Sequence, residues 1–329
     1  MIVMKRMKFL LNLAFVVFAA VPVLAQNDKD KKTKYEFVKT KAVNKTYTVS
    51  ANDKLKIENS FGTVEVHSWN KNEIKVDVSI EVSSNTEDFA QKLIDGISVA
   101  NNQSGNEVSF KTSINGNNNS KNQKSSMSVD YSIYMPESNL LKLSNEFGAT
   151  IIPDMKGTVE LTSKFGSLNT GTLADVKRIN VEFGSTTIES INNGEVHVSY
   201  SKATLNKVSG NVKINFDFCG GVKVNLDNNL TGLELKSSYS TVNLRPAASL
   251  SASYVINTSF GSFKNKSGIK FDSDKDDQDG PKFDFKYEGK SGSGTVPVNI
   301  KDSFGKIILG EAGAEDMEDE KPKNKRKTT

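Results

Sequence analysis

A short hydrophobic pattern recurs along the chain. An aliphatic residue is followed by three mostly polar residues, then by an aromatic residue, and usually by glycine. From residue 147 to residue 260, successive aromatic residues lie 16 to 23 positions apart. The aromatic residues are Phe61, Phe147, Phe165, Phe183, Tyr200, Phe216, Tyr239, Phe260 and Phe304, and the glycines that follow are Gly62, Gly148, Gly166, Gly184, Gly261 and Gly305. Nine copies at a similar spacing indicate a repeat protein.

The alternation within each copy is that of a β-strand. Val196, Val198 and Tyr200 share one parity, as do side chains on one face of a strand. After the aromatic residue, apolar residues return at the third and fifth positions, as Val64 and Val66 do. This shift from even to odd spacing predicts that the chain bends or changes sheet at the glycine. Glycine there allows either a positive φ or a close approach between neighbouring backbones.

Units of 16 to 23 residues have the size of one rung of a parallel β-solenoid, in which stacking buries the apolar face that a single rung cannot bury. We therefore predict an all-β fold, a parallel β-solenoid of about nine to ten rungs. Equivalent aromatic side chains would form a ladder inside it, at about 4.8 Å per rung. The alternative is an antiparallel β-sandwich with regular hairpins, which does not require the same residue type in every second strand.

Residues 51–142 combine the first rung with a segment that departs from the repeat. Alternating apolar residues from Ile74 to Val82 predict a long strand, and residues 87–95 have helical spacing, with Gly96 as a stop signal. We expect this β-rich segment with one short helix to cap the open end of the stack, because exposed strand edges invite aggregation.

The repeats extend over residues 143–310. Within them, residues 266–281 are expected to loop out as an acidic insertion, and residues 283–287 to add a further rung without the full motif. Residues 295–310 are expected to form a trailing rung.

The two ends of the chain predict export and a charged tail. Residues 1–25 have a basic start, an apolar stretch and small residues before Ala25, which is typical of a signal peptide cleaved after that residue. An N-terminal membrane anchor is the alternative, but the apolar run is short for a span. Residues 26–50 form a lead-in. Residues 311–329 change from acidic to basic without apolar periodicity, which predicts a disordered tail.

The charge of the chain is nearly balanced once the leader is set aside. The whole sequence has 43 basic and 39 acidic residues, and three of the basic residues lie in the leader, so 40 and 39 remain. This balance removes the electrostatic case for nucleic acid or anionic membranes as partners. One cysteine and two histidines exclude a disulfide framework and a cysteine-based zinc site, and they leave little for histidine chemistry.

These features together resemble the "putative adhesin" family of exported bacterial proteins, a domain of unknown function. The resemblance rests on the serial aromatic-glycine rungs from 143 to 265, and on Phe61-Gly-x-Val-x-Val leading into Ser68-Trp69. It covers about residues 50–265, with 295–310 as a further rung. The resemblance implies a β-helical protein of the cell envelope. It supplies no catalytic residues.

One acidic stretch invites a calcium interpretation. It reads Asp272-Ser-Asp274-Lys-Asp276-Asp277-Gln-Asp279-Gly280. An EF-hand loop needs glycine at its sixth position and glutamate at its twelfth. Counting from Asp272 gives Asp277 and Phe283, and counting from Asp274 gives Asp279 and Phe285, so both registers fail. We therefore expect a solvated acidic loop and assign no metal site.

Four further residues are considered as candidate chemistry. Cys219 lies three positions after Phe216, where other rungs carry an aliphatic or small residue, so we expect a buried and inert thiol. His67 and His197 have outward parity and no second ligand nearby, which predicts exposed surface residues. Trp69 is expected to pack beneath the N-terminal block, the alternative being a sugar-stacking residue.

Some β-helix proteins process polysaccharides with carboxylates clustered on one outer face. The outward acids here, among them Glu160, Glu182 and Glu195, are scattered among Lys and Asn, so no catalytic residue and no cofactor is assigned. We predict a non-catalytic, adhesin-like binding or scaffolding protein of the periplasm, cell surface or extracellular space. It would present a rigid polar face to a glycan or an envelope protein. The alternatives are a polysaccharide lyase or hydrolase, and an accessory protein in envelope stress signalling.

Overall fold

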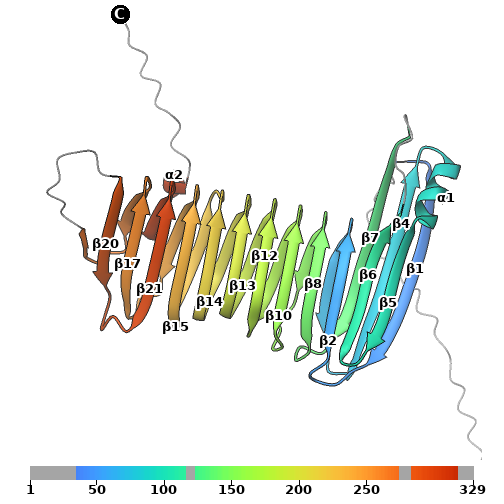
Figure 1. Ribbon diagram of the computed structural model, residues 1–329, viewed down its shortest axis with the longest axis horizontal. Helices are drawn as coiled ribbons and strands as arrows, with labels where there is room; N and C mark the ends of the chain where they lie inside the picture. Colours follow the sequence, from blue (N-terminus) through green and yellow to red (C-terminus); the bar gives the residue numbers. More distant parts are fainter. Residues whose placement is uncertain (1–34, 116–122, 274–282, 318–329) are drawn as a thin grey trace, which may run out of the picture. The chain divides into compact units, whose positions relative to one another are not determined.

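The computed structural model describes residues 35–115, 123–273 and 283–317 (Figure 1). The predicted leader, most of the acidic stretch 272–279 and residues 318–329 lie outside the described residues. The described chain is mostly β, with 22 strands in one mixed, largely parallel sheet and two helices. No helix among the described residues is long and apolar enough to cross a membrane.

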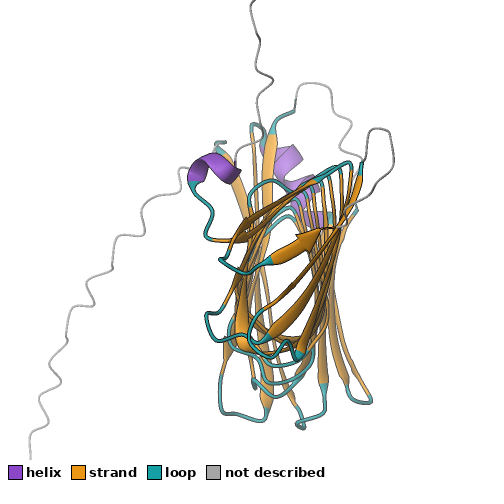
Figure 2. Ribbon diagram, turned by 90° about the vertical axis from the view of Figure 1, so that its left-hand side faces the viewer, coloured by secondary structure: helices purple, strands orange, loops and turns teal. Residues whose placement is uncertain are grey.

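The parallel strands form two layers that face each other (Figure 2). The first layer contains β2 (Lys54–Ser60), β8 (Leu140–Glu146), β10 (Val159–Lys164) and β12 (Val176–Glu182). The second contains β3 (Val64–Ser68), β9 (Ala149–Ile152) and β11 (Ser167–Leu173). The long strands β13 (Ser185–Ser199), β14 (Lys202–Asp217) and β15 (Val222–Ser238) pass through both layers, each with its first half in the second layer.

Equivalent positions of successive repeats lie side by side. Leu161 of β10 pairs in parallel with Leu143 of β8 on one side and with Ile179 of β12 on the other. These three side chains point between the layers and are buried, whereas Glu160 and Thr162 point outward and are half-buried. The parallel register excludes the antiparallel sandwich, because strands joined by hairpins would run in opposite directions.

The last repeat is inserted into the stack and does not trail it. β21 (Val296–Ser303) pairs in parallel with β15 on one side and with β17 (Ala252–Ser259) on the other. In the second layer, β22 (Lys306–Gly310) lies in the same way between β16 (Thr241–Pro246) and β18 (Ser262–Lys266). The expectation of a trailing rung at residues 295–310 is therefore wrong, since the spacing of repeats along the chain does not specify their order in space.

The C-terminal end of the first layer changes to antiparallel pairing. β20 (Asp284–Lys290) pairs antiparallel with β17, and β19 (Phe271–Ser273) pairs antiparallel with β20. The expected extra rung at residues 283–287 is thus a reversed strand. It closes the end of the stack beside β17.

The N-terminal end is covered by antiparallel strands and a helix. β7 (Ser125–Met135) pairs with β3, and β4 (Glu73–Ser84) and β1 (Phe37–Thr48) follow it in antiparallel order. In the first layer, β6 (Glu107–Ile114) pairs with β2, and β5 (Ile97–Ser104) with β6. α1 (Glu87–Asp95) spans the residues for which the sequence predicted a helix, and it buries Phe89, Ala90, Leu93 and Ile94.

The first residues of the predicted tail are ordered. α2 (Ala314–Met317) contacts β16, and the carboxylate of Asp316 pairs with Lys264 at 2.5 Å and with Lys266. The prediction of a disordered tail is therefore wrong for residues 311–317. The reason is a pair of ion pairs, which apolar periodicity does not reveal.

Candidate functional site

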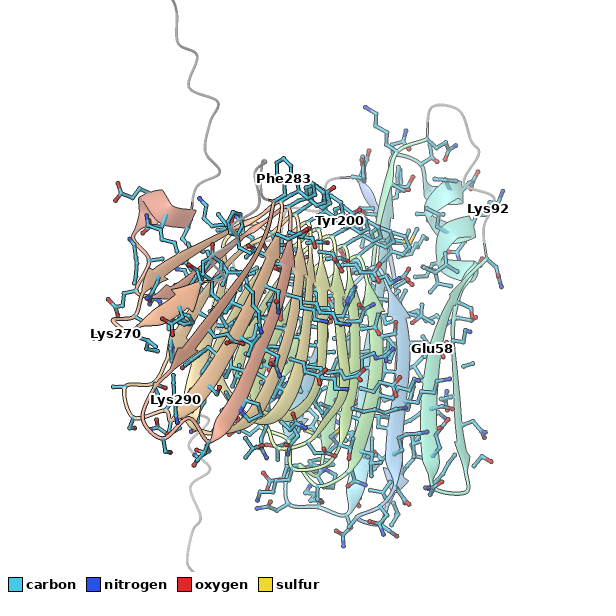
Figure 3. All side chains as sticks on the ribbon, turned by 60° about the vertical axis from the view of Figure 1, so that its left-hand side comes forward. Glu58, Lys92, Tyr200, Lys270, Phe283 and Lys290 are labelled. Carbon is cyan, nitrogen blue, oxygen red and sulfur yellow. The ribbon has the colours of Figure 1, made fainter. Side chains whose placement is uncertain are left out.

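Ten aromatic side chains form a continuous row along one edge of the stack. In spatial order they are Phe61, Phe147, Phe165, Phe183, Tyr200, Phe218, Tyr239, Phe304, Phe260 and Phe283. We call this row the aromatic ridge. Neighbouring ring centroids are 4.7–5.2 Å apart and neighbouring ring planes differ by 3–16°. Figure 3 shows Tyr200 and Phe283 on this edge.

The ridge lies outside the core. Its side chains are 38–54% exposed, and they make up ten of the twelve large exposed hydrophobic residues in the described part of the chain. The sequence predicted an internal ladder of these aromatic residues, and that prediction is wrong. Their parity along the strand pointed inward, but a change in backbone conformation at the aromatic residue itself reverses the direction of the side chain.

That change is a left-handed backbone. Nine of the ten ridge residues, all except Phe283, have φ between 47° and 63°. Bulky residues seldom adopt this region, and holding one there costs roughly 1–3 kcal/mol. Stacking of each ring between two others offsets this cost, since aromatic pairs contribute about 0.5–1.5 kcal/mol beyond the area they bury. The repeat thus places a strained aromatic residue at the same corner of each turn.

One of the predicted rung aromatics is not in the ridge. Phe216 has ordinary inward parity and is fully buried, while Phe218 has φ 54° and stacks between Tyr200 and Tyr239. In this repeat the ridge residue therefore lies two positions later in the chain than the repeat pattern of the sequence predicted. The other eight aromatic residues named from the sequence all lie in the ridge.

The glycines after the ridge residues serve close packing. A Cβ on Gly166 would lie 1.9 Å from the carbonyl oxygen of Gly148, and one on Gly184 would lie 1.9 Å from that of Gly166. None of the six predicted rung glycines has a positive φ among the described backbone. Of the two roles that the sequence left open, close approach is therefore the one that applies.

Where glycine is missing, another small residue occupies the same column. Ser201 follows Tyr200, and its hydroxyl accepts a hydrogen bond from the Gly184 amide at 2.9 Å. Cys219 follows Phe218, so it occupies this glycine column. The repeat pattern of the sequence identified Phe216 as the ring of this repeat and therefore assigned Cys219 to the apolar position three residues after the ring. The thiol is 1% exposed and donates to the carbonyl of Val198 at 3.2 Å. Burial raises its pKa, as expected for an inert cysteine.

The interior position two residues before the ridge is polar at both ends of the stack. Near the N-terminal end, Asn59 donates to the side-chain oxygen of Asn145 at 3.1 Å, and Asn145 donates to the carbonyl of Gly62 at 3.0 Å. Near the C-terminal end, the buried side chain of Asp302 accepts a hydrogen bond from Ser237. Burial raises the pKa of Asp302 to about 6. These groups lie beneath the turn, out of reach of a partner.

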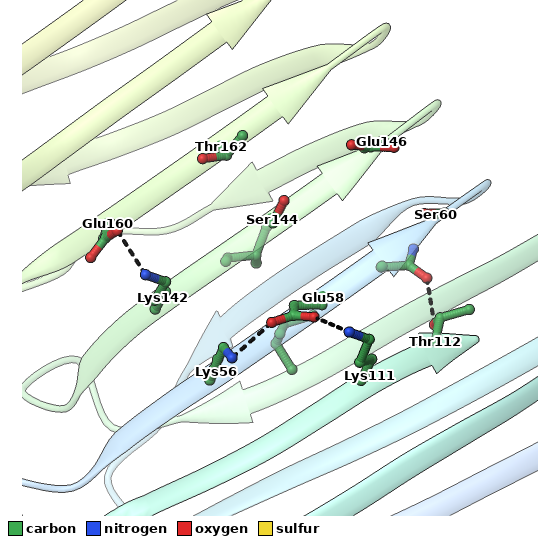
Figure 4. Close-up of a pocket in the computed structure, with 13 residues that line it drawn as sticks. Lys56, Glu58, Ser60, Lys111, Thr112, Lys142, Ser144, Glu146, Glu160 and Thr162 are labelled. Carbon is green, nitrogen blue, oxygen red and sulfur yellow. Dashed lines mark hydrogen bonds and ion pairs between the residues drawn. The ribbon is translucent and has the colours of Figure 1, made fainter.

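The outer surface of the first layer is polar and largely self-neutralised. A hollow of about 310 Å³ lies over β2, β8 and β10, and Figure 4 shows residues that line it. Glu58 lies there between Lys56 and Lys111, and Glu160 lies between Lys142 and Lys177, at distances of 2.7–3.0 Å. Hydrogen bonds from these lysines lower the pKa of both carboxyl groups. They are therefore held ionised, which is opposite to what a general acid requires.

The remaining candidates lie apart from the ridge. The His67 ring stacks on Tyr134 at 4.7 Å, and His197 lies 3.9 Å from Asp217, both on the outer surface. Trp69 is half-buried; its indole N–H donates to the Glu73 carbonyl at 2.8 Å, and the Lys71 ammonium lies 4.8 Å from the ring centre. No cluster of three or more possible metal ligands occurs in the described ranges, and Asp274 to Asp279 lie outside them.

No protein-family model and no curated protein matches the sequence. The solved structures that are similar to this chain include three bacterial proteins. One, described as a putative adhesin from Bacteroides fragilis, has 12% identity and a TM-score of 0.43, covering 82% of this chain and 97% of its own. A putative cell adhesion protein from Clostridium sporogenes has 14% identity and a TM-score of 0.26, covering 83% and 100%. A putative lipid binding protein from Parabacteroides distasonis has 8% identity and a TM-score of 0.35, covering 84% and 100%.

Proposed function

We propose that this protein is an exported, envelope-associated binding or scaffolding protein of adhesin-like type, without catalytic activity, and that the aromatic ridge is its contact surface. The observation that carries the proposal is the ridge itself. An aromatic side chain has about 150–250 Å² of surface, so ten half-exposed rings present on the order of 1,000 Å². The largest apolar patch on a typical monomer is about 300–600 Å², and larger ones mark interaction sites.

The scaffold that we propose is a parallel β-solenoid of about nine to ten rungs. Its support is the parallel pairing of equivalent residues from one repeat to the next, with each turn crossing between two layers at a ridge residue. In such a scaffold each contact residue is fixed by its neighbours above and below. A rigid row of identical contacts needs little ordering when a partner binds, which favours binding.

The outer polar surface supports the non-catalytic part of the proposal. A polysaccharide-cleaving enzyme needs one carboxylic acid with a raised pKa beside a carboxylate. Glu58 and Glu160, which line the hollow over β2, β8 and β10, have lowered pKa values because each is paired with two lysines. Release of reducing sugar from a panel of envelope polysaccharides by the purified protein alone would contradict this part.

A substitution within the ridge tests the contact surface. Phe165, Phe183 and Phe218 are changed together to asparagine, which tolerates a positive φ. Ile151→Asn with Val38→Asn is the matched control, because both residues are 38% exposed and lie off the ridge. Co-sedimentation with isolated bacterial envelope fragments is measured, together with circular dichroism to verify folding. We expect at least a tenfold loss for the ridge variant and none for the control; equal binding by the folded ridge variant would refute the proposal.

A further inference from the structure

We infer that the aromatic ridge docks against the hydrocarbon of a lipid surface, with the long axis of the ridge lying along that surface. This inference rests on the proposed function and names the chemistry of its partner. It follows from which parts of the rings are accessible, from the extent of the row, and from the charges beside it.

The ring faces are already occupied. Each ring from Phe147 to Phe260 in the spatial order is stacked on both sides, at centroid distances of 4.7–5.2 Å. A sugar binds an aromatic side chain by lying on its face, and only the outer faces of the two terminal rings, Phe61 and Phe283, are not taken by another ridge ring. A glycan chain therefore has no platform along the row. The partner must contact ring edges.

Ring edges are apolar, and contact with them requires little specific geometry from the partner. They carry the positive end of the aromatic quadrupole, and aromatic pairs favour offset stacking or edge-to-face contact. Two copies of the ridge would meet edge to edge, which is neither offset stacking nor edge-to-face contact. Fluid acyl chains have no such requirement, because they adapt to the outline of the edges and remove them from water.

The row is long and narrow. Nine successive ring separations of 4.7–5.2 Å give a length of roughly 44 Å with a width of one ring. A planar lipid surface can contact all ten rings at once, whereas a globular partner would contact a few of them. The hydroxyl groups of Tyr200 and Tyr239 suit the same environment, since tyrosine is enriched where hydrocarbon meets head groups.

The charges that flank the ridge are mixed in sign. The residues directly before the ridge aromatics include Glu146, Lys164, Glu182 and Asp217, with Lys164 and Glu182 paired at 3.2 Å, and the other flank carries Lys202 and Lys306. These six groups balance as three acids and three bases. Docking is therefore driven by burial of ring edges and does not depend on anionic lipid, which distinguishes it from binding through a basic patch.

Vesicle flotation tests the inference. Purified protein is mixed with phosphatidylcholine vesicles, and with vesicles that also contain the anionic lipid phosphatidylserine, at low and at high salt. We expect flotation with both vesicles, unchanged within about twofold by salt because the interaction is not ionic. The amount of protein that floats with vesicles should fall at least tenfold in the Phe165→Asn, Phe183→Asn, Phe218→Asn variant. The Ile151→Asn, Val38→Asn control should float as the wild type does. Flotation that requires phosphatidylserine, or that survives in the folded ridge variant, overturns the inference.

A reporter residue gives a second measurement that does not depend on the ridge variant. Phe183→Trp in a Trp69→Phe background places the sole tryptophan in the ridge, and Ile151→Trp in the same background places it elsewhere. Vesicles should shift the emission of the ridge tryptophan to the blue and leave the other unchanged. Absence of any shift overturns the inference.

Failure of the lipid inference is distinguishable from failure of the proposed function. If the wild type does not float but the ridge variant still loses binding to envelope fragments, the ridge binds a protein or a glycan, and only the lipid inference fails. If the ridge variant retains binding in both assays, both fail. A ridge-dependent dimer that does not float, seen by light scattering, also overturns the lipid inference.

Discussion

Gly148 lies directly against Gly62 of the preceding turn, so closely that a Cβ on Gly148 would be 1.8 Å from the Gly62 carbonyl oxygen. The same relationship continues from Gly166 to Gly148 and from Gly184 to Gly166. The atom in the way is backbone in each case and cannot rotate aside. The glycine column beside the ridge therefore sets how closely successive turns approach, and with it the spacing of the stacked rings.

Substitution of Gly148 by alanine should destabilise the protein. Gly148 has no positive φ, so alanine suits its backbone, and only the clash opposes it. We expect the free energy of unfolding to fall by at least about 2 kcal/mol, the scale of overpacking in a tight core. Gly220→Ala is the control, because a Cβ there meets nothing within 4 Å. Urea denaturation measures both, and equal stability of the two variants would contradict the packing role.

The stability of the protein should decrease as pH rises through the pKa of Asp302. Its folded-state pKa of about 6 lies above the ordinary value of 3.8, because burial disfavours the charged form. The contribution of the protonated group is fully present below pH 3.8 and is lost as pH rises through about 6, by up to about 3 kcal/mol. Asp302→Asn should remove this dependence and be the more stable protein at pH 7.

The control for that measurement is Asp284→Asn, which changes an exposed carboxylate on β20, separated from β21 by β17. It should keep the wild-type dependence on pH. The free energy of unfolding of all three proteins is measured by denaturation at a series of pH values from about 4 to 8. This series spans the pKa of Asp302, which is about 6. An Asp302→Asn variant whose stability has the same dependence on pH as the wild type would show that the carboxyl group is not buried as described.

The left-handed backbone predicts the order of stability among substitutions at Phe183. Both Phe183→Asn and Phe183→Ala lose stacking with Phe165 and Tyr200. Asparagine tolerates φ near 55°, whereas alanine is strained there by about 1–2 kcal/mol. We expect both variants to be less stable than the wild type, with the alanine variant the weaker by about 1 kcal/mol. Thermal unfolding measures the order, and an alanine variant as stable as the asparagine variant would argue against the positive φ.

The sequence predicted the type of fold better than it predicted the surface. Strand alternation and the repeat interval identified parallel, stacked β-structure, because burial between two layers imposes a period of two. Parity alone put the aromatic side chains inside. It failed because a single left-handed residue reverses side-chain direction, and Phe and Tyr are not the residues expected in that region.

Two further features were beyond sequence reasoning. Phe216 and Phe218 are two aromatic residues of equal parity, so pattern matching could not decide which one lies at the corner. The insertion of β21 between β15 and β17 depends on which neighbour the last repeat selects in space. The position after the ridge residue was the better signal, since glycine, serine or cysteine follows every ridge residue except Phe283.

The thiol of Cys219 should react slowly while the protein is folded. It is buried, donates to the Val198 carbonyl, and has a pKa raised by burial, so little thiolate is exposed to reagent. We expect labelling by a maleimide at pH 7 to be at least about a hundredfold slower than in denaturant, as set by rare opening. Cys219→Ser should fold normally, because serine occupies this column in both neighbouring turns, as Ser201 and Ser240. Fast labelling of the folded protein would place the residue outside the column.

The last described helix should depend on one carboxylate. The side chain of Asp316 is 1% exposed and pairs with Lys264 and Lys266, and these hydrogen bonds hold its pKa well below the ordinary value. Asp316→Asn should release residues 311–317 from β16, so that limited proteolysis cleaves this segment several times faster. Glu315→Gln, which changes the exposed neighbouring acid, is the control and should be cleaved at the wild-type rate. Because the pKa is lowered, the attachment is fully present above about pH 4 and weakens only in stronger acid. Equal cleavage of the two variants at pH 7 would show that the ion pairs do not hold the segment in place.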